Sequence, residues 1–399
     1  MLSLLHNFSE RLEEKRDLIT DWMATKRSEV EIPIYGSVDI RDAGWKVAVV
    51  DANHFPAGFN NVSKEEEPHL SELLKKYILT KHLECSWVHL YPESHTRNSA
   101  YVENLSTIKR LIENAGFRCT VGAPELENHG SLNGLSGPLK LDQVSIHEDE
   151  ILVDGKKPCL ILLNNDLTEG VLPGLSGQQV SPPVHMGWHR RRKSQHFEVL
   201  QNYVDELSEL IGIDPWHLMC DWFVSEDKCL DKEKCRITLA AEIDEFLAKI
   251  QQKYDDLGID SEPVVFLKND SGTYGLGILT LKSGSEILEL SNRKMKRLMY
   301  SKGGNDVENF LIQEGVPTSL KTINGGAVEP VVYLVAGEAA SWFYRVNEKK
   351  GDLENLNSPS AKFVSISEAE SNLTEHAHGW HALVAELSML AMGGESEIS

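Results

Sequence analysis

Residues 264–281, with the sequence VVFLKNDSGTYGLGILTL, decide which fold we expect the chain to adopt. Two runs of β-forming residues flank a segment with glycines at positions 272, 275 and 277, and Lys268 lies at the end of the first run. This pattern predicts a β-hairpin with a tip that carries few side chains. Glycine lets a backbone approach a ligand closely, so N–H groups of the tip could point at phosphate oxygens beside the lysine charge. The stretch therefore predicts a flap over a phosphate-bearing ligand.

Three other nucleotide-binding patterns do not fit this segment. In a P-loop the lysine follows the glycines and a helix begins there, whereas Lys268 precedes the glycines and the chain continues as a strand. The dinucleotide fingerprint G-x-G-x-x-G is absent, and so are the HRD and DFG motifs of protein kinases. The arrangement resembles the ATP-grasp fold, in which two α+β subdomains clamp ATP. A simple turn is the structural alternative for glycines in a hairpin.

Two later segments extend this resemblance to residues 264–348. NFLIQEGV (309–316) resembles the strand that lines the adenine pocket, and VEPVVYLVAGEAASWFYRVNE (328–348) resembles strands that end in a phosphate-contacting arginine, here Arg345. The resemblance implies ATP as a cofactor, and Lys268 and Arg345 as catalytic residues. The implied nucleotide contacts are Lys268, Gly272, Thr273, Tyr274, Gly275, Gly277, Gln313, Glu314 and Val316.

A magnesium ion that bridges the nucleotide phosphates would need oxygen ligands from the protein. ATP-grasp enzymes usually offer a late Glu-x-Asn, and this chain departs from that form. The segment GDLENLNSPSAKF (351–363) has Glu354 and Asn357 three residues apart, and Glu329 lies on an earlier strand. We expect these three residues to hold Mg²⁺, and a solvated loop is the alternative for each.

The first half of the chain alternates strand-like and helix-like segments, which predicts a parallel sheet with helical crossovers. Three strand-like runs, the first of them WKVAVVDAN (45–53), are each followed by a polar loop. These loops are DANHFPAGFNN (51–61), YPESHTRN (91–98) and LNNDLTEG (163–170). Because ligands bind beyond the carboxyl ends of parallel strands, three such loops favour a polar-ligand site over simple turns.

The Pro/Gly/Ser-rich stretch PGLSGQQVSPP (173–183) predicts the boundary between two domains. We expect an N-terminal α/β substrate-binding domain over residues 1–183 and an ATP-grasp domain over residues 184–399. The predicted fold class is α/β (α+β), an ATP-grasp fold with an N-terminal parallel-sheet α/β domain.

Composition and charge limit the partners of the chain. Its 399 residues are enough for two domains, and its net charge of -21 argues against nucleic acid or an anionic membrane. No apolar run reaches the ~20 residues that span a bilayer, and residues 1–23 are typical of an amphipathic helix, not of a signal peptide.

The six cysteines form no CxxC pair, so we expect free core or surface cysteines and no zinc site. We expect a cytoplasmic protein with small-molecule substrates, and the sequence is compatible with a homo-oligomer.

Longer phrases carry a closer resemblance. YGSVDIRDAGWKVAVVDANHFPAGFNN (35–61), HMGWHRRRKSQHF (185–197) and FLKNDSGTYGLGI (266–278) are similar to the bacterial glutamate-cysteine ligase family that has an ATP-grasp domain, distinct from the glutamine-synthetase-like type. This resemblance covers about residues 34 to 363. It implies that ATP, L-glutamate and L-cysteine give γ-glutamylcysteine through an acyl phosphate, the first step of glutathione biosynthesis. The chain departs from the family at Ser360, where the family has glycine, and in its short C-terminal region.

The family also draws attention to the basic run HRRRKSQH (189–196). A basic run is usually a solvated surface, but the neighbouring Trp188 and histidines favour partial burial with one or two arginines at the site. We expect a catalytic role for Arg191. His95 could serve as a base for the incoming amine, or it could be a structural histidine. The expected contacts to substrate ammonium and carboxylate groups are Asp39, Arg41, Asp51, Asn53, Asn60, Asn61, Glu93, His95, Arg97, Asn98, Asn165, Asp166 and Arg190.

Two alternatives stay open at this point. One is an ATP-grasp carboxylate-amine ligase, either a γ-glutamyl or a peptide ligase, that uses a different acceptor amine. The other is a nucleotide-binding protein without turnover. The irregular metal motif would allow it, whereas the intact Lys268, glycines and Arg345 argue against it.

Overall fold

The computed structural model describes residues 9–94, 97–271, 278–299, 309–322, 324–357, 360–364 and 377–398. The described residues form a mixed α/β fold with a four-stranded parallel sheet, antiparallel sheets of five and four strands, and two small hairpins, which confirms the predicted fold class. No helix among the described residues has the length and apolar character needed to cross a bilayer.

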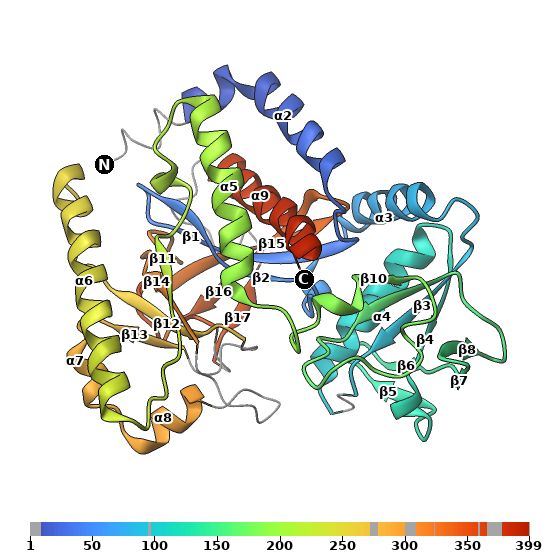
Figure 1. Ribbon diagram of the computed structural model, residues 1–399. Helices are drawn as coiled ribbons and strands as arrows, with labels where there is room; N and C mark the ends of the chain where they lie inside the picture. Colours follow the sequence, from blue (N-terminus) through green and yellow to red (C-terminus); the bar gives the residue numbers. More distant parts are fainter. Residues whose placement is uncertain are drawn as a thin grey trace.

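The central sheet is antiparallel and has the strand order β17-β16-β15-β1-β2. Helices α5 and α9 cover one face of it, with α2 outside them (Figure 1). The run 45–53, which we expected in a parallel sheet, is instead β2 of this sheet. Four residues separate it from β1, and so short a connection makes a hairpin, not a crossover. The bounds are β1 Tyr35–Asp42, β2 Val47–Asn53, β15 Ala327–Val335, β16 Glu338–Asn347, β17 Lys362–Val364, α2 Arg16–Glu29, α5 Lys193–Ile211 and α9 Ala377–Ile398.

The predicted parallel sheet is present, with the order β10-β9-β3-β4. Helix α4 connects β3 to β4, and its buried residues at positions 101, 105, 108 and 112 share one face at helical spacing. The bounds are β3 Trp87–Pro92, β4 Arg118–Val121, β9 Leu160–Asn164, β10 Val180–Ser181, α3 Glu67–Lys81 and α4 Ser99–Asn114. Two small hairpins lie between β4 and β9, with the bounds β5 Ser131–Asn133, β6 Pro138–Lys140, β7 Val144–His147 and β8 Glu150–Val153.

The second antiparallel sheet contains the hairpin of residues 264–281. Its order is β11-β14-β12-β13, and β12 pairs with β13 in the register Val265 to Leu281, which confirms the predicted strand pairing. The glycine-rich tip lies outside the described residues. Helix α6 lies along this sheet, with α7 and α8 near it (Figure 1). The bounds are β11 Trp222–Ser225, β12 Val265–Asn269, β13 Leu279–Leu281, β14 Phe310–Glu314, α6 Glu233–Leu257, α7 Ser285–Leu288 and α8 Asn292–Met299, and the 3-10 turns are Phe59–Asn61, Pro124–Leu126, Val184–Met186 and Pro215–His217.

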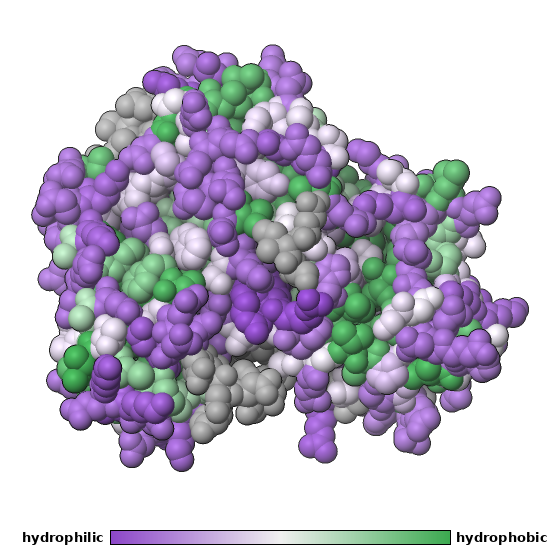
Figure 2. Space-filling model, viewed as in Figure 1, coloured by the Kyte–Doolittle hydropathy of each residue, from purple (hydrophilic) through white to green (hydrophobic). Residues whose placement is uncertain are grey.

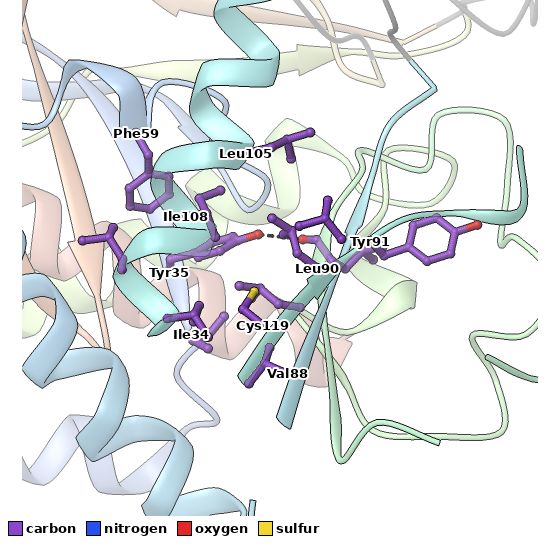
Figure 3. Packing of buried hydrophobic residues seen from close by; sticks show 14 of the residues in the cluster. Ile34, Tyr35, Phe59, Val88, Leu90, Tyr91, Leu105, Ile108 and Cys119 are labelled. Carbon is purple, nitrogen blue, oxygen red and sulfur yellow. Dashed lines mark hydrogen bonds between the residues drawn. The ribbon is translucent and has the colours of Figure 1, made fainter. Parts of the chain in front are cut away.

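Tyr35 joins the central sheet to the parallel sheet. Its side chain leaves β1 and its hydroxyl donates to the carbonyl oxygen of Leu163 on β9 at 2.7 Å (Figure 3). The Tyr35 ring also packs on Phe59, with 5.6 Å between the centroids. Both sheets therefore share one apolar cluster, which fixes the polar loops of the first half relative to β1. The predicted boundary after residue 183 stays a prediction, and the central sheet takes strands from both sides of it.

Two of the six cysteines are not free. Cys85 and Cys159 form a disulfide between the segments that precede β3 and β9, with 5.6 Å between their Cα atoms. These strands are neighbours in the parallel sheet, so residues 74 positions apart meet at one edge. The expectation of six free cysteines is wrong for this pair, and the other four are free as expected.

Candidate active site

A pocket with an empty volume of about 610 Å³ lies between the hairpin and the central sheet. We call it the hairpin pocket, because Phe266, Lys268 and Ile278 of the hairpin segment form part of its wall. Its volume is in the range of small-molecule sites. The other lining residues are Asp39, Arg41, Val50, Asp51, Lys193, Asn269, Glu329, Arg345, Asn355 and Asn357.

Lys268 is almost completely buried in the wall of this pocket. Its Nζ donates to the carbonyl oxygen of Val50 and to Oε1 of Gln313, both at 2.6 Å. Burial lowers the pKa of Lys268 to about 8, although the charge of Asp51 opposes this shift. An ammonium group has three N–H donors, so the two described acceptors leave one donor for a ligand in the pocket.

Arg345 lies opposite in the same pocket, within a buried network of charges. Strands β15 and β16 pair Glu329 with Arg345 in register. Arg345 contacts Glu329 and binds both carboxylate oxygens of Asp39, with Nη1 at 2.7 Å and Nη2 at 3.2 Å. Arg41 donates from Nε to Glu329 at 2.6 Å. The network holds the Arg345 guanidinium at the pocket wall.

The two carboxylates of this network titrate differently. Burial raises the pKa of Asp39 to about 6, against the lowering effect of Arg345. Burial alone would also raise the pKa of Glu329, but Arg41 and Arg345 together lower it below its ordinary value. Glu329 is therefore the carboxylate that is held ionised, because two guanidinium groups bind it.

A second pocket, with an empty volume of about 1120 Å³, lies between the central sheet and the loops of the first half of the chain. We call it the loop pocket. Aromatic rings line one part of it, and amide and carboxylate groups line another, so it can hold a small ligand that carries several charged groups. Its lining includes Phe55, Tyr333, Phe343, Phe363, Trp188, Asn53, Asn60, Asn61 and Asp166.

The two pockets meet at five residues that line both, and we call this place the junction. It consists of Asp39, Asp51, Lys193, Arg345 and Asn357. Lys193 donates from Nζ to Oδ1 of Asp51 at 2.7 Å. Burial would raise the pKa of Asp51, but Lys193 and other nearby cations lower it to about 2. Two cation–carboxylate pairs therefore stand between the pockets.

The basic run reaches the junction through Lys193, not through an arginine. Arg191 lines neither pocket, because its buried guanidinium binds Glu395 and the carbonyl oxygen of Ala52. The expected catalytic role of Arg191 is therefore not compatible with its position. Arg190 is exposed, and the surface around the segment before α5 is strongly hydrophilic (Figure 2). Its contact with substrate stays a prediction.

The loop after β2 reaches the loop pocket as expected, although β2 is antiparallel. Asn53, Asn60 and Asn61 all line this pocket. The Asn53 side chain also accepts from the backbone N–H of Phe55 at 3.0 Å, so part of its role is to shape the loop. The polar segment therefore lines a pocket although its strand is not in the parallel sheet, and the contact of these residues with substrate stays a prediction.

The other two loops contribute less than expected. Asp166 lines the loop pocket. The Glu93 carboxylate accepts from the backbone N–H of Asp166 at 3.2 Å, and Glu93 lines neither pocket. Asn98 caps α4 by accepting from the N–H of Tyr101, and Asn165 donates to a backbone carbonyl. These contacts are turn and cap interactions, which explain the same residue types without a ligand. Arg97 is exposed and lines neither pocket, and His95 lies outside the described residues.

The side chains of the three residues expected around adenine are buried and line neither pocket. Gln313 is fully buried and binds Lys268, and Val316 packs in the apolar cluster under α6. Glu314 pairs with Lys46 in the interior, where neither side chain is exposed. These side chains do not line the pockets, so the apolar wall is instead made by Val50, Phe266 and Ile278. Apolar residues in strands give no signal of their own, and the sequence could not single them out. Of the other nucleotide contacts expected, Gly272, Thr273, Tyr274, Gly275 and Gly277 lie outside the described residues.

The expected metal ligands are only partly together. Glu329 and Asn357 line the hairpin pocket, whereas Glu354 is exposed and binds the N–H of Gly351 and the ammonium of Lys350. The expectation for Glu354 is wrong because this loop turns it outward, and Asn355 lines the pocket in its place. Among the described residues, no three acidic, histidine or cysteine side chains form a metal-binding group. A cation here would need amide and ligand oxygens as well as carboxylates.

Comparisons with known proteins show the family of the chain. The sequence matches the family model for glutamate-cysteine ligase over residues 9–395. The crystal structure of a candidate gamma-glutamylcysteine synthetase from Methylobacillus flagellatus KT is similar over 99% of this chain and 96% of that chain, with a TM-score of 0.91 and 31% identity. None of the curated proteins compared matches the chain.

Two other solved structures are far less similar. D-alanyl-alanine synthetase A from Vibrio cholerae O1 covers 77% of this chain and 81% of its own, with a TM-score of 0.36 and 11% identity. A glutathione synthetase-like effector from Globodera pallida covers 91% of this chain and 79% of its own, with a TM-score of 0.38 and 8% identity. At these scores neither structure carries an argument about this protein.

Proposed function

The chain belongs to the glutamate-cysteine ligase family, and from this premise we infer that it is an ATP-dependent carboxylate-amine ligase that joins L-glutamate to L-cysteine. The product is γ-glutamylcysteine, and the reaction is the first step of glutathione biosynthesis. The observation that carries the inference is the family match over residues 9–395, supported by a similar structure at a TM-score of 0.91.

The chemistry requires the activation of a carboxylate. A carboxylate is a poor electrophile, so an oxygen of the glutamate γ-carboxylate attacks the γ-phosphorus of ATP, and ADP leaves. The amine of cysteine then attacks the acyl phosphate, phosphate leaves with the bonding electrons, and the amine loses a proton. No protein nucleophile is needed. The protein contributes by placing the reactants in line and by stabilising the negative charge that develops during transfer.

We assign the hairpin pocket to ATP and the loop pocket to the amino acids. The apolar side chains of Val50, Phe266 and Ile278 suit an adenine ring, and the free donor of Lys268 suits a phosphate. The amides and carboxylate of the loop pocket suit ammonium and carboxylate groups. Because Lys193 and Arg345 lie at the junction, each can contact a phosphoryl group that passes from one pocket to the other.

ATP-dependent ligation usually employs a divalent cation, and we propose Mg²⁺ in the hairpin pocket. The donor set fits a hard cation, since Glu329, Asp39, Asn355 and Asn357 all present oxygen atoms to this pocket. When bound, the ion would neutralise negative charge on the nucleotide phosphates. Asp39 and Glu329, which both pair with Arg345, are the carboxylates that would hold the ion, and Arg345 would contact the transferred phosphoryl group from the junction.

The function is tested by incubating the protein with ATP, Mg²⁺, glutamate and one amine at a time. We expect mass detection of a γ-linked dipeptide with cysteine, one ADP per dipeptide, and the highest kcat/KM for cysteine among the amines. A higher kcat/KM for another amine would identify a different acceptor. Nucleotide binding without ADP formation in any mixture would contradict catalysis.

Nucleotide affinity is expected to fall as the pH rises above about 8. Burial lowers the pKa of Lys268 from 10.5 to about 8, so the side chain is charged below this pH and neutral above it. A neutral amine no longer attracts phosphate, and the affinity should fall by up to ~10-fold per pH unit. Calorimetric titration with ATP between pH ~6.5 and ~9.5 measures this. Arginine keeps its charge over this range, so Lys268→Arg should remove the decline, and an unchanged decline in that variant would contradict the assignment.

A further inference from the structure

A buried group of charges around Glu395 has no part in the mechanism described so far. Glu395 lies near the end of α9 and is 1% exposed. Its carboxylate accepts from the guanidinium of Arg191, with Nη2 at 3.0 Å and Nε at 3.1 Å. His54 Nε2 lies 2.7 Å from the same carboxylate and His196 Nδ1 lies 3.2 Å from it. All four side chains are buried, so the group is isolated from solvent.

Within this group the carboxylate charge of Glu395 lies against the guanidinium charge of Arg191. Burial lowers the pKa of His54 to about 4, so its imidazole is neutral near pH 7 and can donate Nε2–H to Glu395. The charge of Arg191 then lowers the pKa of Glu395 well below its ordinary value, although burial alone would raise it. His196 also contacts Ser388 of α9, at 3.0 Å from its Nε2.

Arg191 links this group to the junction. Its Nη1 donates to the carbonyl oxygen of Ala52 at 2.8 Å, and Ala52 lies between the pocket residues Asp51 and Asn53. Two residues after Arg191, the ammonium of Lys193 binds Asp51. These two contacts connect the end of β2 to the start of α5 beside the junction. Glu395 of the C-terminal helix binds Arg191, which makes one of them.

The charges around Asp51 indicate what Glu395 does. Arg191 already interacts favourably with Asp51 through space, as do Lys193 and Lys268. If Arg191 lost its partner Glu395, its buried charge would be uncompensated, and Asp51, which precedes Ala52 on β2, is the carboxylate of β2 that it already attracts. Asp51 would then be shared between Arg191 and Lys193, and Lys193 would leave its position at the junction.

We propose that Glu395 is a positioning residue for the ligase reaction. It holds Arg191 away from Asp51 and so keeps the Asp51–Lys193 pair in place where the two pockets meet. This proposal rests on the proposed function of the junction, and it adds the C-terminal helix to the parts of the chain that determine the rate.

The test compares Glu395→Gln with Glu386→Gln. Glu386 is on the same helix and pairs with Arg27 at 2.8 Å, away from both pockets, so its replacement removes an arginine–glutamate pair, here a partly exposed one, from the same element. We expect Glu395→Gln to lower kcat by roughly 10- to 100-fold, because small misplacements of a catalytic group have effects of this size. The KM for ATP should change by less than about threefold. Glu386→Gln should keep the kcat of the unmodified protein at temperatures below its Tm.

A second variant separates positioning from folding. In Arg191→Gln/Glu395→Gln both buried charges are removed, so nothing competes with Lys193 for Asp51. We expect this double variant to recover at least several-fold of the kcat lost in Glu395→Gln. Equal kcat in Glu395→Gln and Glu386→Gln, or a double variant no faster than Glu395→Gln, would overturn the proposal. Dipeptide formation by the unmodified protein and by Glu386→Gln would leave the proposed function intact in either case.

Discussion

Lys268→Ala is expected to lower kcat/KM for ATP by roughly 10²- to 10³-fold, so that little γ-glutamylcysteine forms. The ammonium of Lys268 is held by the carbonyl of Val50 and by Gln313, with its remaining donor available in the hairpin pocket. Alanine removes the charge that we assign to the nucleotide phosphates, and no neighbouring cation can replace it from the same strand. Initial rates of ADP release at varied ATP concentrations measure the loss.

The matched control for this change is Lys228→Ala. Like Lys268, Lys228 donates to a backbone carbonyl, that of Glu226, but its other partner is the carboxylate of Glu242 and it lines neither pocket. We expect its replacement to leave kcat/KM within about twofold, as we expect of Cys229→Ser. If Lys268→Ala kept half of the activity, or if Cys229→Ser were inactive, the assignment of the hairpin pocket would fail.

Arg345→Ala is expected to reduce both activity and stability. The guanidinium neutralises Asp39 and Glu329 in a buried network. Its removal leaves Arg41 as the described guanidinium partner of Glu329 and takes away the arginine that pairs with Asp39. Breaking a buried pair in this way typically costs about 3–5 kcal/mol of unfolding free energy. The loss of a charge at the junction should also lower kcat by roughly 10²- to 10³-fold. Urea unfolding and ADP release, measured on the same preparation, give the two quantities.

Two further variants test whether the loss is specific to Arg345 and whether its charge alone is responsible. Arg110→Ala removes a bidentate pair with Glu67 outside the pockets, and because Arg110 is partly exposed the cost should be at most about 1 kcal/mol with unchanged kcat. Arg345→Lys keeps the charge but not the planar pair of donors that binds Asp39, so it should recover little activity. Full activity in Arg345→Lys would show that charge alone is needed at this position.

Several residues that line the two pockets carry a local sequence signal, and their roles at the site stay predictions. Lys268 was recognisable from its place at the end of a β-run before three glycines, and Arg345 from a long strand in a segment similar to a known family. The loop residues Asn53, Asn60 and Asn61 were recognisable because polar residues after a strand seldom lie in the core.

The predictions that failed depend on the direction in which a side chain points. Glu354 and Asn355 are neighbours in one loop, and the fold turns the amide, not the carboxylate, into the hairpin pocket. Likewise the basic run contains Arg191, two residues before α5, and Lys193, the first residue of α5. Of these two residues, the lysine lines the junction and the arginine does not. Composition cannot separate such neighbours, because both members of each pair suit the same chemistry.

The sequence by itself determined the local elements: the hairpin strands, the alternation of strands and helices in the first half, and the basic and glycine-rich segments. Only the tertiary structure decided which of these meet. Asp39 and Arg345 are 306 residues apart, and Arg191 and Glu395 are 204 residues apart. Hydrogen-bonding preference and periodicity act over a few residues, whereas such distant contacts depend on how the sheets pack and on which carboxylate each buried cation reaches.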